Sequence, residues 1–198
     1  MKLFIKSICI AFVLTVIYST LPFEAECADI SNEVFRLHIL ANSDAEADQN
    51  LKIKVRDKVL EYTEQLFDNA KSKEEAEITI ADNIQSINNV AYKEILDNGY
   101  SYPVKTEITN MYFTTRYYEN YTLPSGMYDA LRITIGEGKG HNWWCVMYPS
   151  ICISTVEEQD EKAREVFEEE QYNIVKNEKV QYKFKIVEIF EKICSCFR

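Results

Sequence analysis

A histidine and a cysteine four residues apart are the pair in this chain that could support nucleophilic catalysis. They are His141 and Cys145, in the segment Gly-His-Asn-Trp-Trp-Cys. An imidazole that takes the proton of a thiol generates a thiolate nucleophile. On a regular strand, however, residues four apart are separated by roughly 13 Å, so the pair requires a bend in the chain. His38 is a second candidate base, and a hydrolase that uses Cys145 with a histidine is one interpretation. The motifs G-x-S-x-G, Asp-Thr/Ser-Gly and H-E-x-x-H do not occur in the sequence.

The cysteines also allow a disulfide. Cys145 and Cys152 are seven residues apart around Tyr148-Pro149, a spacing that can close a bridge across a turn in an oxidising compartment. Free buried thiols are the other interpretation of these two residues. Zinc would need both cysteines with His38 and His141, but no C-x-x-C or H-x-x-x-H spacing supports such a site. The sequence therefore predicts no metal and no cofactor.

The run Gly136-Glu-Gly-Lys-Gly140 resembles a phosphate-binding loop in composition. Such loops need a following helix whose N-terminal amides face the phosphate, and here a strand follows. We interpret the run as a flexible hairpin loop. A more specific alternative is a mobile recognition loop flanked by Trp143 and Trp144. Adjacent residues on a strand point to opposite faces, so one tryptophan should enter the core and the other should be exposed or cover the loop. An exposed tryptophan beside a glycine loop has the composition of a binding hot spot. Packing of both rings within the domain is the other interpretation.

Two helices and a sheet are expected to position these residues. Residues 33–40 alternate apolar and polar side chains, which is typical of a strand with one buried face. Ser43 and Glu46 fit a capping box for a helix that reaches about residue 67, and Ser72 and Glu75 fit one for a helix that ends at Asn98-Gly99. Asp44, Glu46 and Asp48 are then acids of a first helical turn rather than a catalytic set.

The second half of the chain has strand periodicity. Residues 102–109, 131–135 and 142–148 are expected to be three consecutive strands of an antiparallel meander packed under the two helices. The segment 155–170 carries eight acidic residues and is expected to be a solvated helix or linker. Residues 180–186 alternate again and predict a late strand. The fold class is therefore α+β, with two helices from the N-terminal half on a mostly antiparallel sheet.

Charge and the N-terminus restrict the classes of function. The formal net charge of −10 argues against a nucleic-acid partner. Lys2 and Lys6 precede an apolar run from Ile8 to Tyr18, which has the length of a signal-peptide core rather than of a spanning helix. Residues 1–28 are expected to be a signal peptide, or an uncleaved anchor. Residues 29–153 are expected to form an α+β signalling domain, and residues 154–198 an acidic segment with a C-terminal strand and tail.

Several motifs taken together resemble the stage II sporulation protein R family. They lie between about residues 33 and 190 and are Phe35–Asp44, Asp48-Gln49, Leu51–Asp57, Thr114–Tyr117, Leu123–Tyr128, Ala130–Arg132, Gly138–Cys145, Tyr148-Pro149 and Phe184–Glu188. The resemblance implies a protein made in the forespore and exported into the space between forespore and mother cell. There it would trigger a membrane-embedded aspartic protease of the mother cell, which removes the pro-sequence from sigma E.

On this resemblance the chain is a ligand for a protein and not an enzyme, with no small-molecule substrate. The family does not assign a contact surface, so we infer one from the chemistry of the residues. The expected partner-contact residues are Arg116, Arg132, His141, Asn142, Trp143, Trp144 and Tyr148. A secreted hydrolase and an anchored structural component of the envelope are the alternatives.

Overall fold

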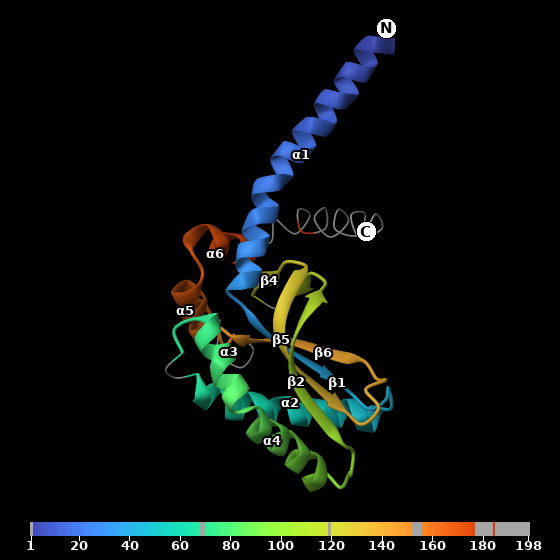
Figure 1. Ribbon diagram of the computed structural model, residues 1–198, viewed down its shortest axis with the longest axis vertical. Coiled ribbons are helices and arrows are strands. Elements are labelled where there is room, and N and C mark those ends of the chain that lie inside the picture. The colour runs from blue at the N-terminus through green and yellow to red at the C-terminus, as the bar shows by residue number, and fades with distance from the viewer. Residues whose placement is uncertain (1, 68–69, 119, 152–155, 177–183, 185–198) are drawn as a thin grey trace. The chain divides into compact units, whose positions relative to one another are not determined.

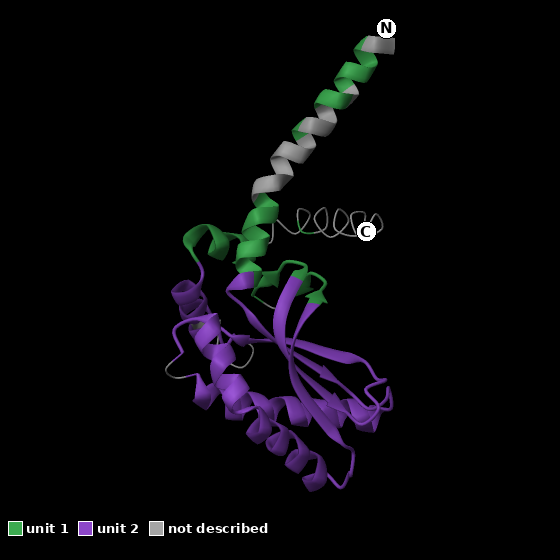
Figure 2. Ribbon diagram, in the orientation of Figure 1, with its two compact units in different colours: residues 1–31, 112–126, 168–198 green, residues 32–111, 127–167 purple. Residues whose placement is uncertain are grey.

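The structure is a computed structural model that describes residues 2–67, 70–118, 120–151, 156–176 and 184 (Figure 1). The chain divides into two compact units (Figure 2). Unit 1 comprises residues 1–31, 112–126 and 168–198, and unit 2 comprises residues 32–111 and 127–167. The expected domain boundaries after residues 28 and 153 stay predictions, because the two units do not show which segments fold independently.

Unit 2 is built on a four-stranded sheet. Strands β1 (Phe35–Leu40), β2 (Val104–Phe113), β5 (Gly126–Ile135) and β6 (Asn142–Tyr148) lie in the order β2-β5-β1-β6. Strand β1 is parallel to β5 and antiparallel to β6. The sheet is mostly antiparallel, as predicted, and the fold is α+β. The expected meander is wrong, because β1 separates β5 from β6.

The central place of β1 changes the environment of its polar residues. The alternation in the sequence predicts one buried face, but Arg36 is 0% exposed and His38 is 3% exposed. The Arg36 Nε–H donates a hydrogen bond to the carbonyl oxygen of Cys145, and the guanidinium carbon lies 4.9 Å from the centre of the Tyr128 ring. On this face Tyr128 packs against Arg36 and Trp144 stacks on His38, so side chains of the two neighbouring strands bury the second face of β1.

Three helices cover one face of the sheet (Figure 1): α2 (Glu46–Leu66), α3 (Lys73–Asp82) and α4 (Ile84–Asp97). The predicted first helix is confirmed, although it begins after Ala45 and Ser43 does not cap it. The predicted second helix is divided at Asn83, which ends α3 and begins α4. Ser72 caps α3 as predicted, since its Oγ accepts a hydrogen bond from the backbone N–H of Glu75.

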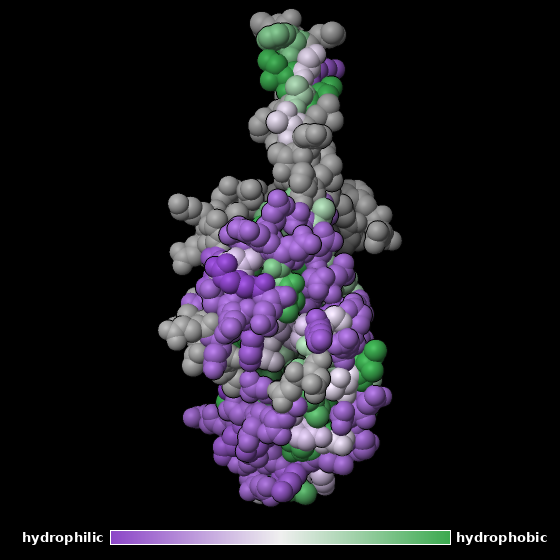
Figure 3. All heavy atoms as spheres, turned by 90° about the vertical axis from the view of Figure 1, so that its left-hand side faces the viewer, coloured by the Kyte–Doolittle hydropathy of each residue, from purple (hydrophilic) through white to green (hydrophobic). Residues whose placement is uncertain are grey.

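The core lies between these helices and the sheet. Buried side chains from both layers fill it, including Phe35, Leu37, Ile39, Leu51, Val55, Val59, Ile80, Ile87, Ala91, Ile95, Leu131, Ile133, Cys145 and Met147. The apolar positions at three- and four-residue steps in the helices therefore meet the alternate apolar positions of the strands. On the helix side of unit 2, hydrophilic side chains cover most of the surface seen in Figure 3. Helix α5 (Val156–Val166) also belongs to this unit.

Unit 1 contains helix α1 (Lys2–Asn32, all but its last residue), the short antiparallel pair β3 (Arg116–Tyr117) and β4 (Thr122–Leu123), and helix α6 (Glu169–Lys176). Among the described residues, no helix combines the length and the apolar character needed to cross a membrane. The acidic segment, expected to be a solvated helix or linker, forms α5 and the start of α6 in its described part, with a break at Phe167 and Glu168, and its Ala163 and Phe167 are buried. Of the predicted strand 180–186 only Phe184 is described, and it is helical, buried and 5.2 Å from the ring of Phe23.

Candidate partner-contact surface

The glycine-rich turn between β5 and β6 is held against the end of β1. Because β1 is parallel to β5 and lies between β5 and β6, the turn must pass over the residues that follow β1. The backbone N–H groups of Lys139 and Gly140 donate to the carbonyl oxygens of Asn42 and Ala41, at 3.2 and 3.0 Å. The expected hairpin is therefore wrong, because β5 and β6 are not adjacent and the turn is hydrogen-bonded to the segment that follows β1. The expected flexibility of the turn stays a prediction.

Close approach explains the glycines of this turn. A Cβ atom on Gly140 would come 2.2 Å from the carbonyl oxygen of Ser43, and one on Gly136 would come 2.2 Å from Asn42 Oδ1. Gly136 also has a φ of 59°, in the left-handed region that glycine adopts most easily. Gly136 and Gly140 are therefore needed because a larger side chain would clash, and Gly136 also because of its backbone conformation.

A buried carboxylate organises the segment on which the turn rests. Asp48 Oδ2 accepts hydrogen bonds from Asn42 Nδ2 at 2.8 Å and from Ser43 Oγ at 2.6 Å. Burial alone would raise the pKa of Asp48, but hydrogen bonds from Ser43, Asn42 and Tyr102 outweigh it, and the pKa is lowered. Asp48 therefore stays ionised as an anchor of the loop, which gives this acid a structural role.

Lysine 52 connects the same segment to the start of β6. Its ammonium donates to Gln49 Oε1 at 2.6 Å and to the carbonyl oxygen of His141 at 2.8 Å. Burial lowers the pKa of Lys52. His141 itself is exposed: its backbone N–H and its ring Nδ1 lie 2.6 and 2.5 Å from Asp44 Oδ1. The hydrogen bond from the His141 backbone is the main reason that the pKa of Asp44 is lowered.

The two tryptophans lie on opposite faces of the sheet, as predicted, and both are half-buried. Trp143 packs against the core on the helix side, and the Arg56 guanidinium carbon lies 4.2 Å from its ring centre. Trp144 stacks on His38, with ring centres 3.9 Å apart and planes 10° apart. Packing of both rings within the domain, the second interpretation of the sequence, describes the structure better than one fully exposed ring.

Arg132 lies beside this stack on the face of the sheet that the helices do not cover. In the strand register Arg132 and Trp144 flank His38 from β5 and β6. Arg132 forms an ion pair with Glu107 of β2, and the side chains of these two residues are 35% and 28% exposed. The sheet therefore brings four side chains from four strands into one row, which is Glu107, Arg132, His38 and Trp144.

The remaining predicted contact residues are not members of this row. Asn142 is exposed at the start of β6, next to His141, whereas Tyr148 at the other end of the strand is 7% exposed. Arg116 belongs to unit 1. Sequence reasoning missed Glu107 and Arg56, because pairing between strands and between helix and strand leaves no spacing signal in the sequence. The assignment of these residues to partner contact stays a prediction.

The hydrolase interpretation does not fit the placement of Cys145. Cys145 is 3% exposed and its sulfur is bonded in a disulfide, so no thiolate is available. It lies opposite Leu37 on the core face, whereas the next residue, His38, points to the other face. Its predicted partner, Cys152, lies outside the described residues. Within the described ranges, no group of three or more His, Cys, Asp or Glu side chains is arranged to hold a metal ion.

Comparisons with known proteins agree with the motifs. The family model described as Stage II sporulation protein R (spore_II_R) matches residues 31–159. The chain is 34% identical, over 139 residues, to the protein named Stage II sporulation protein R of Bacillus subtilis (strain 168). The match covers 67% of this chain but only 62% of the Bacillus subtilis protein. No solved structure matches the chain.

The matched region holds all four strands of the sheet, the three helices that cover it, and the turn from Gly136 to Gly140. This extent is well over half of the chain, and the chain belongs to the stage II sporulation protein R family.

Proposed function

We propose that this chain is an exported signalling protein of sporulation that activates a membrane-embedded aspartic protease of the mother cell. The protein is made in the forespore and acts in the space between forespore and mother cell. The activated protease then removes the pro-sequence of sigma E. The observation that carries the proposal is the family match over residues 31–159.

The N-terminal composition supports export. Lys2 and Lys6 followed by the apolar run Ile8–Tyr18 have the order of a signal peptide. The many acidic residues of the chain suit a protein that acts in solution beside a membrane rather than one held by anionic lipids.

The described side chains support a binding role better than a catalytic one. Cys145 is engaged in a disulfide, His38 is stacked on Trp144, and Asp48 in the first turn of α2 holds the loop after β1. These groups stabilise the fold, and we propose that the protein acts by contact, without turnover of its own.

The proposal is tested by reconstitution in a bacterium that does not sporulate. The chain, the cognate protease and its pro-sigma E substrate are co-expressed, and removal of the pro-sequence is scored by immunoblot. Processing is expected only when all three are present and the chain is exported. A protease variant without its catalytic aspartates is the control for processing by host enzymes. Absence of processing with three folded, correctly located proteins would contradict the proposal.

A further inference from the structure

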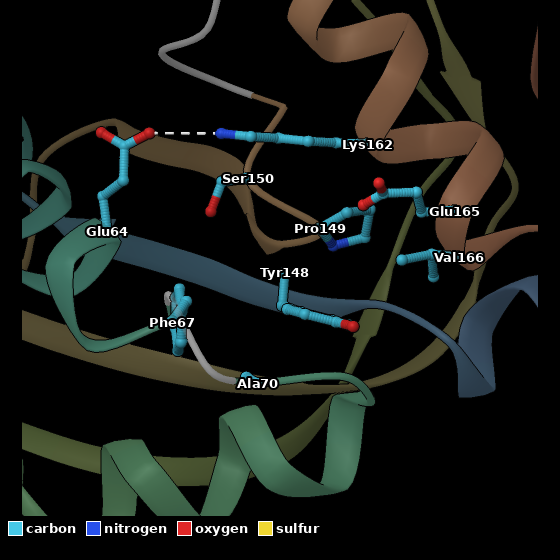
Figure 4. Close-up of a pocket in the computed structure, with 9 residues that line it drawn as sticks. All are labelled: Glu64, Phe67, Ala70, Tyr148, Pro149, Ser150, Lys162, Glu165 and Val166. Carbon is cyan, nitrogen blue, oxygen red and sulfur yellow. Dashed lines mark hydrogen bonds and ion pairs between the residues drawn. The ribbon is translucent and has the colours of Figure 1, made fainter.

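Unit 2 contains a cavity of about 270 Å³ at the end of the sheet opposite to the glycine turn (Figure 4). Its apolar floor consists of Phe67, Tyr148, Pro149 and Val166, and the rings of Phe67 and Tyr148 meet edge to face at 6.2 Å. Above this floor the lining is polar, because the ionisable side chains of Glu64, Lys162 and Glu165 and the hydroxyl of Ser150 complete it. An apolar floor beneath placed polar groups can bind a ligand or a side chain of a partner. A small part of Phe67 and of Tyr148 stays accessible to solvent in the cavity, although both residues also belong to the core beneath it.

The mouth of the cavity is acidic. Glu64 of α2 and Glu165 of α5 line it, and among the described residues Glu165 forms no hydrogen bond or ion pair. Glu33, Glu74 and Glu75 lie close enough to affect Tyr148: burial is the first cause that raises its pKa, and the fields of Glu33, Glu75, Glu165 and Glu74 add to it. Two carboxylates therefore line the mouth, and the fields of three further ones reach the floor at Tyr148.

The hydroxyl of Tyr148 is a hydrogen-bonding group without a partner. The residue is 7% exposed and lines the cavity, and its hydroxyl makes no hydrogen bond with any described residue. A phenol hydroxyl that faces a cavity can donate to or accept from a ligand in place of water. Figure 4 shows the hydroxyl end of Tyr148 directed away from Phe67, toward the side on which Val166 lies.

One cation of the chain itself lies at the mouth. The ammonium of Lys162 lies 3.3 Å from Glu64 Oε1, and the two side chains are 35% and 45% exposed (Figure 4). An exposed pair of this kind is weak, so a better-placed cation can compete with it. Glu165 has no such ion pair with a described residue, so its carboxylate is available to a ligand.

We propose that this cavity binds a basic side chain, arginine or lysine, presented by an extracytoplasmic segment of the protein partner. The aliphatic stem would lie on the apolar floor, and the charged end would meet Glu165 with a hydrogen bond to the Tyr148 hydroxyl. Glu64, on the opposite side of the cavity in Figure 4, would add to the negative field. The identity of the partner rests on the proposed function. Binding of a basic side chain by the cavity does not, and it can be tested separately.

The first test uses the full chain in a mild detergent and the peptide acetyl-Leu-Arg-Phe-amide. Binding is followed by two-dimensional amide NMR at Phe67, Tyr148 and Val166. The matched probe is acetyl-Leu-citrulline-Phe-amide, which has the same shape without the charge. We expect saturable shifts at these amides with the arginine peptide, and binding weaker by about tenfold with the citrulline peptide.

The double variant Glu64→Gln with Glu165→Gln should weaken binding of the arginine peptide by about tenfold, since it removes both carboxylates of the mouth. Glu61→Gln is the matched control, because Glu61 pairs with Lys58 on the same helix and does not line the cavity. Binding should also weaken as salt is raised. Equal affinity for both peptides, or shifts spread outside the cavity, would overturn the proposed chemistry.

The second test transfers the same variants to the reconstituted processing assay. The double variant should reduce processing at equal protein level, and Glu61→Gln should not. If the arginine peptide binds but the double variant signals normally, the cavity is not the contact with the protease. If the parent chain gives no processing at all, the proposed function fails, while the peptide test still decides the chemistry of the cavity.

Discussion

Individual polar residues of this protein divide into those that hold the fold and those that remain accessible to a partner. Asp48, Lys52 and His38 are buried and engaged with neighbouring groups. Arg132 and His141 keep accessible side chains, although each pairs with an acid. Substitutions at the first set should change stability, and substitutions at the second set should change binding with little effect on stability.

Replacement of Asp48 by alanine should destabilise the protein by about 3 kcal/mol, because it leaves the donors of Asn42, Ser43 and Tyr102 without their acceptor. Urea unfolding of the full chain at pH 7 measures the change. Asp82→Asn, an exposed substitution near the end of α3, is the control and should be nearly neutral. A cost at Asp48 no larger than at Asp82 would contradict the anchoring role.

The same residue predicts a dependence of stability on pH. The pKa of Asp48 in the folded state lies below its unfolded value of about 3.9, so its contribution is complete above that pH. The contribution is lost as pH falls through the folded pKa. Between pH 5 and pH 2, the parent protein should therefore lose more unfolding free energy than Asp48→Asn, whose own stability is already reduced. Parallel loss in both proteins would contradict the low pKa.

Glu107→Gln breaks the ion pair with Arg132 and should change the free energy of unfolding by less than about 1 kcal/mol, because both side chains are partly exposed. The measurement is again urea unfolding, paired with the processing assay. Reduced processing at unchanged stability would support a contact role for the row that contains Arg132. Unchanged processing would remove Arg132 from the proposed contact surface.

Local elements were predictable from the sequence where periodicity and caps were strong. The helix from Glu46 to Leu66, the cap at Ser72 and the strand Asn142–Tyr148 agree with the patterns. The insertion of β1 between β5 and β6 was not predictable, because periodicity describes one strand and carries no information about its neighbours. The break at Asn83 was missed because apolar residues continue at helical spacing on both sides of it.

The same limit applies to the candidate site. Opposite faces for Trp143 and Trp144 follow from the alternation of a strand. Their partners Arg56 and His38 do not follow, because one comes from a helix and the other from a strand placed between β5 and β6. The contacts of the glycine turn do not follow from the sequence either, because the segment after β1 that it contacts is nearly a hundred residues away.

The turn between β5 and β6 gives a test at the level of elements. Gly140→Ala should destabilise the protein by about 2 kcal/mol or more, since the new Cβ meets the backbone carbonyl of Ser43. Gly99→Ala is the comparison: its Cβ meets no atom within 4 Å, so only its positive φ of 82° opposes alanine, at about 1 kcal/mol. Thermal unfolding compares the two. A smaller effect at Gly140 than at Gly99 would contradict docking of the turn.

For the whole molecule, the proposed function assigns export to the N-terminal segment and signalling to the region that matches the family. The family match begins at residue 31, after the apolar N-terminal stretch. Replacement of residues 1–28 by an unrelated cleavable signal peptide should therefore preserve processing in the reconstituted assay. Deletion of residues 2–22 should abolish it, because the chain would stay in the compartment of its synthesis. Loss of activity in the exported replacement would show that the N-terminal segment itself takes part in signalling.

The central claim is that this chain activates the protease, and processing of pro-sigma E in the reconstituted host tests it most directly. The measurement is the fraction of pro-sigma E converted as expression of the exported chain is increased at fixed protease level. If the chain activates the protease, conversion of pro-sigma E should rise with the dose of the chain and should be absent with the inactive protease. Conversion that is independent of the chain, or absent at every dose with all components folded and in place, would contradict it.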